Sequence, residues 1–143
     1  MKPEESLSAS LAEWLAYAHP HDNPKGLFYF MVPNERQSGT KQQRAIAAGQ
    51  LKRMGLRPGT ADWVFVWWED LLGKPRPLMA WEVGKVLRIG FLELKAGSND
   101  QTANQITFQR QAEAFGLRYD VAYTLDECIA TLRAWGAIPG ERT

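Results

Sequence analysis

The sequence predicts a single α/β domain, with a mixed central sheet of about four strands and helices on both sides. Three observations predict this class. Short β-rich runs alternate with amphipathic stretches along the chain. A chain of 143 residues suits one domain that buries roughly two thirds of its unfolded surface. A composition of 45% hydrophobic and 23% charged residues is typical of globular proteins. We therefore expect residues 1–143 to form one domain.

The first half of the chain predicts two helices and two strands. Glu4 to Ala18 repeats apolar residues at helical spacing, which predicts an amphipathic helix. Leu27 to Val32 is short, aromatic and bounded by a glycine and a proline, which favours a buried strand. Thr40 to Met54 predicts a second helix, because a glycine follows it at the position common after helix ends. Trp63 to Trp68 is a β-rich run that predicts the second strand.

The second half predicts two more strands and two more helices. Residues 69–87 contain the breaker sequence GKPRP and predict a long hairpin connection or an insertion. They lead into a strand from Val86 to Lys95. Helices are predicted from Thr102 to Phe115 and from Thr124 to Gly136, because each begins with a capping-box pattern and ends at a glycine. Between these helices, Tyr119 to Tyr123 predicts a short fourth strand.

The positive charge of the chain is concentrated in one segment. The net charge is only +1, which does not by itself indicate a nucleic-acid-binding protein. Between Glu35 and Arg57, however, that glutamate is the only acid among six basic residues. These residues either form a solvated helix face or neutralise nucleic-acid phosphates without reading sequence. They are Arg36, Lys41, Arg44, Lys52, Arg53 and Arg57.

The sequence predicts a cytoplasmic protein. Cys128 is the only cysteine, so an internal disulfide framework is excluded and a reducing compartment is favoured. The first ten residues, MKPEESLSAS, are polar and lack the apolar core of a signal peptide. No stretch approaches the 18 or so apolar residues that a membrane-spanning helix requires. We therefore expect no membrane association.

Residues 88–97, RIGFLELKAG, place an acid and a lysine two positions apart in a run typical of a buried strand. Because residues i and i+2 share a strand face, Glu93 and Lys95 project together. Leu92 and Leu94 then point into the core. A solvated ion pair on an edge strand is one interpretation. On a central strand, charges of this kind are costly and usually functional.

Asp62 completes a set of groups suited to phosphodiester hydrolysis. It lies at the start of the predicted strand from Trp63 to Trp68, which comes before the strand that carries Glu93. Carboxylates on neighbouring strands can share a hard divalent cation such as Mg²⁺. A cation of this kind offsets negative charge on a phosphate and acidifies a water, and a lysine ammonium can stabilise the transition state.

These residues resemble the VRR-NUC branch of the PD-(D/E)xK nuclease superfamily, which includes small stand-alone phage and bacterial proteins. The resemblance covers most of the chain, and several spaced segments in the right order carry it. Ala61 departs from the family pattern, which has proline before the aspartate, and residues between Asp62 and Glu93 are more numerous than in compact members. The matching segments are VPNERQS (32–38), LKRMGLRPGTAD (51–62), GFLELKAG (90–97), TANQITF (102–108) and TLDECIATLRAWG (124–136).

The resemblance implies a restriction-endonuclease-like core and a role for each candidate residue. Asp62 and Glu93 are expected to bind Mg²⁺ or Mn²⁺ together with the Leu94 backbone carbonyl. Lys95 is the expected catalytic lysine. Two further expected active-site residues are Gln105 and an acid of the first helix, for which Glu4 fits by spacing and Glu5 is the alternative.

The family implies a metal-dependent DNA endonuclease that prefers branched or four-way-junction DNA and acts as a homodimer. Two alternatives stay open: a nucleic-acid-binding module that keeps the fold without catalysis, and a nuclease that acts on RNA. The residues leave two further choices. Gln109 lies one helical turn after Gln105 and is the weaker candidate, and Trp63, Trp67 and Trp68 either stack on bases or, as their strand pattern favours, pack in the core.

Overall fold

The computed structural model describes residues 3–21, 26–33, 40–54, 57, 59–70 and 84–140, apart from the side chains at 44, 47, 48, 51 and 52. The predicted order of elements is confirmed, and every bound lies within two residues of its predicted position. The elements are α1 (Pro3–Ala18), β1 (Leu27–Met31), α2 (Lys41–Arg53), β2 (Trp63–Asp70), β3 (Lys85–Leu94), α3 (Ala103–Ala114), β4 (Arg118–Ala122) and α4 (Leu125–Trp135).

The four strands form one mixed sheet in the order β1-β2-β3-β4. The first three strands are antiparallel to their neighbours, whereas β4 runs parallel to β3. This arrangement confirms an α/β fold with a mixed four-stranded sheet. It also confirms that β3, which carries the Glu-x-Lys pair, lies between two other strands.

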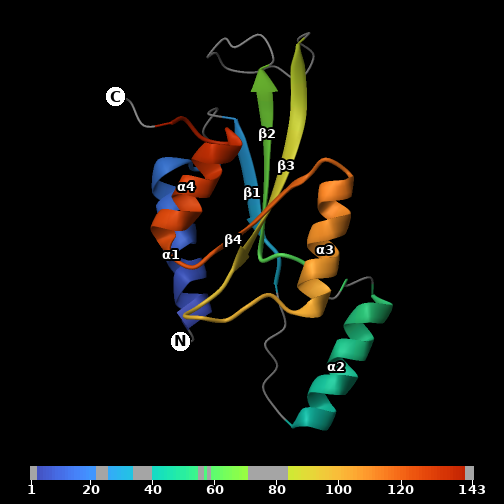
Figure 1. Ribbon diagram of the computed structural model, residues 1–143. Helices are drawn as coiled ribbons and strands as arrows, with labels where there is room; N and C mark the ends of the chain where they lie inside the picture. The colour runs from blue at the N-terminus through green and yellow to red at the C-terminus, as the bar shows by residue number, and fades with distance from the viewer. Residues whose placement is uncertain are drawn as a thin grey trace.

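Helices cover both faces of the sheet. Helices α1 and α4 pack together on one face, and α3 lies on the other (Figure 1). The larger core lies under α1 and α4, where Leu92 and Leu94 of β3 are buried against apolar residues of both helices. The smaller core lies under α3 and contains Phe108 and Tyr119. Each face of the sheet therefore has its own apolar cluster.

Tryptophan packing accounts for the aromatic runs in the sequence. Trp63 and Trp67 are 4% and 2% exposed and belong to the larger core. Trp67 stacks on Trp135 of α4 with ring centroids 5.8 Å apart. A Cβ added at Gly90 would lie 2.4 Å from the Trp135 ring, so glycine permits this close approach. Neither Trp63 nor Trp67 is available to stack on nucleic-acid bases, and the core interpretation is confirmed for both.

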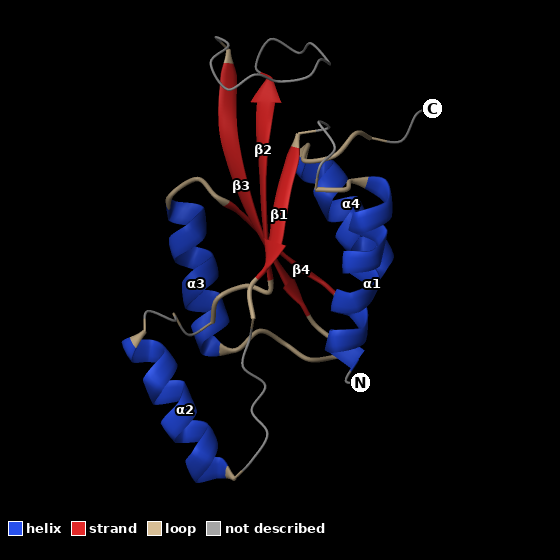
Figure 2. Ribbon diagram, turned by 180° about the vertical axis from the view of Figure 1, so that it is seen from behind, coloured by secondary structure: helices blue, strands red, loops and turns tan. Residues whose placement is uncertain are grey.

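Helix α2 lies apart from these layers. Figure 2 shows α2 beyond the N-terminal end of α3, away from the sheet. Strands β2 and β3 pair as far as Asp70 and Lys85. Residues 69, 70 and 85–87, at the two ends of the predicted connection, therefore belong to the strands. Residues 71–83, in its middle, lie outside the described residues. Within the described ranges, none of the helices combines the length and the apolar character needed to cross a bilayer.

Candidate active site

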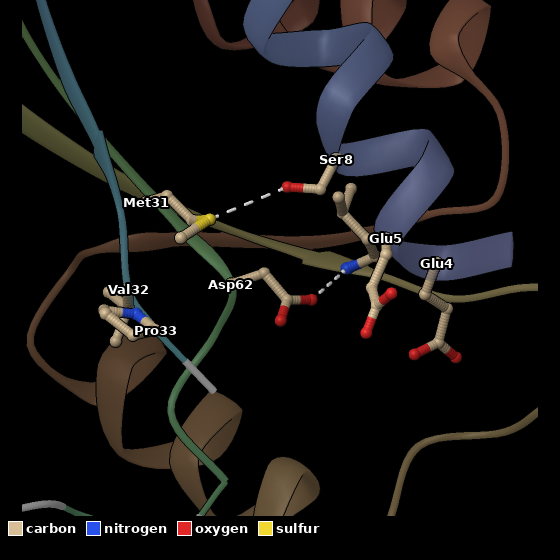
Figure 3. Close-up of a pocket in the computed structure, with 8 residues that line it drawn as sticks. Glu4, Glu5, Ser8, Met31, Val32, Pro33 and Asp62 are labelled. Carbon is tan, nitrogen blue, oxygen red and sulfur yellow. Dashed lines mark hydrogen bonds between the residues drawn. The ribbon is translucent and has the colours of Figure 1, made fainter. Parts of the chain in front are cut away.

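The register of β2 and β3 brings Asp62 to Glu93. Trp63 pairs with Leu92 in an antiparallel ladder, so the residue before Trp63 faces the residue after Leu92. The Asp62 Oδ2 atom accepts a hydrogen bond of 2.7 Å from the backbone N–H of Leu94 (Figure 3). This bond holds the Asp62 carboxyl at the end of β3. The predicted proximity of the two acids is confirmed.

Glu93 points away from the larger core and is almost completely buried. Its neighbours Leu92 and Leu94 occupy the opposite face, and the exposed fraction of Glu93 is 2%. Its Oε1 atom accepts a hydrogen bond of 2.7 Å from Nε2 of Gln105. Its Oε2 atom is buried and has no hydrogen-bond partner among the described residues. A buried carboxyl oxygen without a donor is a position that a cation suits.

The surroundings of Glu93 disfavour its charged form. Burial is the main cause that raises its pKa to about 9, and the adjacent Asp62 carboxyl adds to the increase. The positive charge of Lys95 lowers the pKa but offsets only part of this effect. Glu4 raises the pKa slightly further. The positive charge of these neighbours is therefore too small to keep both acids ionised in the buried site.

Lys95 lies on the same side of β3 as Glu93, as its spacing predicts. It follows the last residue of the strand, and its backbone N–H donates to the Ala122 carbonyl at 3.0 Å, which continues the pairing with β4. The exposed fraction of Lys95 is 7%. A lysine this buried next to two acids can deliver positive charge into the site without being screened by solvent.

Gln105 has two hydrogen bonds that together set its orientation. Its Oε1 atom accepts from the backbone N–H of Thr102 at 2.8 Å, which is one half of the capping box at the start of α3. The other half is the bond from the Gln105 backbone N–H to Thr102 Oγ1. Because the amide oxygen is occupied by the cap, the Nε2 atom points to Glu93. Gln109 instead accepts a bond from Gln101, whereas Gln105 is the glutamine that donates to Glu93.

Gly59 allows the chain before β2 to lie against the first turn of α3. It has a φ of +80°, a conformation that favours glycine. A Cβ at this position would lie 2.4 Å from the backbone carbonyl of Asn104 and 2.7 Å from the Gln105 nitrogen. This close approach brings the segment that ends at Asp62 beside the helix that carries Gln105.

Glu4 and Glu5 reach the site from the first turn of α1. Both line a cavity of about 320 Å³ that is also lined by Asp62 and Leu94. Figure 3 shows their carboxyl groups on the Asp62 side of the helix. Glu4 is the acid whose charge acts on Glu93. The two first-helix acids therefore line the same cavity as Asp62.

The donor set for a metal ion is limited. Among the described residues, no three His, Cys, Asp or Glu side chains are grouped so that they could hold a metal ion. Asp62 and Glu93 would supply two carboxylates, and Leu94 lines the same cavity as Asp62. A set of this size suits Mg²⁺, which is usually bound by one or two carboxylates and keeps several waters.

The predicted basic surface is only partly described. Lys41 and Arg53 are exposed at the two ends of α2, and Arg57 is exposed with its guanidinium 5.2 Å from the centre of the Phe108 ring. Arg36 lies outside the described residues, as do the side chains of Arg44 and Lys52. The described members thus lie on the side of the molecule where α3 begins.

Sequence reasoning missed a polar group next to Glu93. Gln101 Nε2 donates to Gln109 Oε1 at 3.0 Å and to the Tyr119 hydroxyl at 3.2 Å. Burial, and then the charge of Glu93, raise the pKa of Tyr119, which places its ring near the site. No local pattern marks these residues, because Tyr119 reads as an ordinary strand residue and Gln101 as a loop residue.

Comparisons of the chain with protein-family models, with curated proteins and with solved structures found no match.

Proposed function

We propose that the protein is a nuclease that hydrolyses phosphodiester bonds in DNA and uses Mg²⁺ or Mn²⁺ as its cofactor. The observation that carries the proposal is the buried Glu93 carboxyl beside Asp62, with one oxygen that has no hydrogen-bond partner among the described residues. Two neighbouring carboxyl groups can both ionise in a buried site only if cations offset their charge. Lys95 contributes one positive charge, and a divalent ion would contribute the remainder.

Each residue of the site then has a role that its position supports. Asp62 and Glu93 would hold the ion together with the Leu94 backbone carbonyl. An ion bound there would acidify a water and offset negative charge on the phosphate. Lys95, with three N–H donors, would stabilise the charge on the phosphate oxygens. Gln105 would hold the Glu93 carboxyl in place.

A first-helix acid would complete the site. Glu4 is the acid that we assign, because it lines the cavity with Asp62 and its spacing ahead of Trp14 fits the resemblance. It would orient a water or a water-bound ion from the α1 side of the cavity that it lines with Asp62. Glu5 lines the same cavity and is the alternative.

We also propose that the sheet and its helices are a restriction-endonuclease-like core of the VRR-NUC type. Three features support this assignment. Asp62 precedes β2, the Glu-x-Lys pair lies at the end of β3, and Gln105 lies in the first turn of the next helix and donates to Glu93. The same resemblance favours branched or four-way-junction DNA as the substrate and a homodimer as the active form, because two sites related by a two-fold axis can cut both strands.

Exposed arginine and lysine side chains would bind the DNA backbone. Lys41, Arg53 and Arg57 are exposed, and contacts of this kind position DNA without reading its sequence. We extend the proposal to Arg36, Arg44 and Lys52, which belong to the same basic segment of the sequence.

The nuclease proposal is tested by cleavage of linear, flapped and four-way DNA with Mg²⁺ or Mn²⁺. We expect the wild-type protein to cleave at least one of these substrates and to stop when a chelator is added. Lys95→Ala should reduce the cleavage rate by about a hundredfold or more, because it removes a charge donor from the transition state. Lys85→Ala is the matched control, since Lys85 lies at the other end of β3 and its loss should leave the cleavage rate at the wild-type value.

Two other outcomes would assign a different function. A mobility shift of branched DNA without cleavage under any metal condition would indicate a binding module with the same fold. Cleavage of the matching RNA, but not of the DNA, would indicate a ribonuclease. Equal cleavage by wild type and Lys95→Ala would contradict the assigned site.

A further inference from the structure

A second cavity, of about 400 Å³, lies between α3 and the sheet. Three aromatic rings and a leucine form most of its apolar wall, and an arginine and a glutamine supply polar groups. Its volume is within the range of sites that bind small molecules. No acidic side chain is among the described residues that line it. The residues that matter here are Phe91, Phe108, Phe115, Leu117, Arg57 and Gln111.

This cavity lies next to the candidate active site, because the same elements contribute to both. Phe91 is two residues before Glu93, so it projects from the same face of β3 at a spacing of about 7 Å along the strand. Phe108 is three residues after Gln105, so the two side chains are neighbours on the surface of α3. From Phe91 and Phe108 the cavity extends along the second half of α3, and its exposed ring, Phe115, is ten residues or about 15 Å of helix beyond Gln105.

Of the aromatic rings that line the cavity, Phe108 is buried and Phe115 is exposed. Phe108 is 8% exposed, and its ring meets the Phe91 ring edge to face at 5.0 Å. Phe115 follows the last residue of α3 and is 83% exposed. The Arg57 guanidinium lies over the Phe108 ring at 5.2 Å from its centre. A flat ligand could therefore stack on the exposed Phe115 ring while its edge meets Arg57 and Gln111.

We propose that this cavity receives the base of an unpaired nucleotide on the strand that is cut. A nucleobase has two apolar faces that stack on aromatic rings and a polar edge that arginine and glutamine can hydrogen-bond. The positive charge of Arg57 and the lack of lining acids suit a ligand that is attached to phosphates. The proposal rests on the nuclease function for the position of the phosphate.

The proposal defines the class of substrate. Bases in a continuous duplex are stacked and paired, and they reach a cavity only at the cost of unstacking. Flaps, bulges, junction arms and single strands supply unpaired bases without this cost. DNA and RNA carry the same base chemistry, so both polymers belong in the test.

The experiment measures binding of single-stranded DNA and RNA oligonucleotides with Ca²⁺ in place of Mg²⁺. One base at a time is replaced by an abasic site. The variant is Phe115→Ala, which removes an exposed ring, and the matched control is Tyr17→Ala, which removes a ring that is 89% exposed on α1, over the other face of the sheet. We expect one abasic position to weaken binding by about tenfold in wild type and in Tyr17→Ala, and Phe115→Ala to lose this sensitivity.

A fluorescent base gives a second readout. The analogue 2-aminopurine at the sensitive position should be quenched on binding to wild type, because quenching reports stacking on an aromatic ring, and it should stay bright with Phe115→Ala. Equal effects of abasic sites at all positions, or the same sensitivity in Phe115→Ala, would overturn the proposal. A dimer that becomes a monomer in Phe115→Ala would also overturn it, since the cavity would then hold a second copy.

The outcomes separate this inference from the nuclease proposal. Position-dependent base binding in a protein that cuts no nucleic acid would support the base site and remove the nuclease function. Metal-dependent cleavage without any base-dependent binding would leave the nuclease function and overturn the base site.

Discussion

Glu93 is a carboxyl group in a position where a negative charge is costly. The pKa near 9 means that the folded, metal-free protein binds a proton at Glu93 more tightly than the unfolded chain does. The stability that Glu93 contributes is therefore fully present below its unfolded pKa of 4.5 and is lost as the pH rises toward 9. A bound divalent ion would replace the proton and counteract this loss.

We expect the free energy of unfolding, measured in the presence of a chelator, to decrease as the pH rises from 4.5 to about 9. The contribution of one group cannot exceed about 1.4 kcal/mol per pH unit. Glu93→Gln keeps the shape of the side chain but cannot ionise, so its stability should fall less over the same interval. Urea denaturation at several pH values measures both proteins. Parallel pH profiles for the two would show that Glu93 does not titrate as described.

Gln105 acts on Glu93 through a hydrogen bond, and its own orientation depends on the helix cap. Gln105→Glu keeps an acceptor for the Thr102 backbone N–H but replaces the Nε2 donor by an oxygen that faces Glu93. We expect a loss of stability of about 1–3 kcal/mol in chelator at about pH 8, because the amide donor is lost and a carboxylate is introduced beside the buried Glu93. The loss should be smaller at about pH 5, where the introduced carboxyl group can hold a proton as well as Glu93.

Thermal or urea denaturation of wild type and Gln105→Glu at the two pH values measures this effect. Equal losses at both pH values would mean that the side chain at position 105 does not face Glu93. The substitution Gln105→Ala serves as the comparison that removes the cap contact as well.

The N-terminus of α3 couples a local structure to the site. Thr102 and Thr124 are both N-caps whose side chains accept a backbone N–H, but only the first is part of a capping box whose glutamine reaches Glu93. Thr102→Ala and Thr124→Ala should each cost about 1 kcal/mol of stability. Only Thr102→Ala should also lower the cleavage rate, because Gln105 then loses the contact that orients its amide.

Denaturation and cleavage assays on the two variants make this comparison. Similar stability losses together with similar cleavage rates would mean that the cap of α3 has no part in the site. Both caps are threonines in the extended region that accept a hydrogen bond from a backbone N–H. A decrease in cleavage rate that is caused only by lower stability should therefore appear in both variants.

The register between β2 and β3 is an element-scale requirement of the site. A slip of one residue would turn Glu93 and Lys95 into the larger core and Leu92 and Leu94 to the other face. Burial of the leucines under α1 and α4 therefore selects the register that places Asp62 opposite Glu93. Packing on one face of the sheet thus specifies the chemistry on the other.

At the scale of the whole molecule, the larger core isolates its only cysteine from solvent. Cys128 of α4 has an exposed fraction of zero, and burial is the main cause that raises the pKa of its thiol to about 12. The thiolate is the reactive form. We expect native protein at about pH 8 to be inert to a thiol reagent and to react as denaturant opens the layer of α1 and α4.

The reaction rate across a denaturant series measures this opening, and its midpoint should coincide with that of tryptophan fluorescence, since Trp67 and Trp135 stack in the same core. Rapid labelling without denaturant would mean that α4 opens separately from the rest of the fold.

The sequence by itself determined the elements and the face on which each candidate residue lies. Strand alternation placed Glu93 and Lys95 together, and the two Thr-x-x-Gln/Glu patterns located α3 and α4. These features are local, because periodicity and capping depend on residues within a few positions of one another.

The tertiary structure alone decided which of these residues meet. The bond from Gln105 to Glu93, the contact of Gln101 with Tyr119 and the cavity beside Phe108 all join residues on different elements. Such contacts depend on how the strands pair and how α3 packs on the sheet, and both follow from burial over the whole chain. No local pattern encodes them, because each partner taken alone is compatible with an ordinary strand, loop or helix surface.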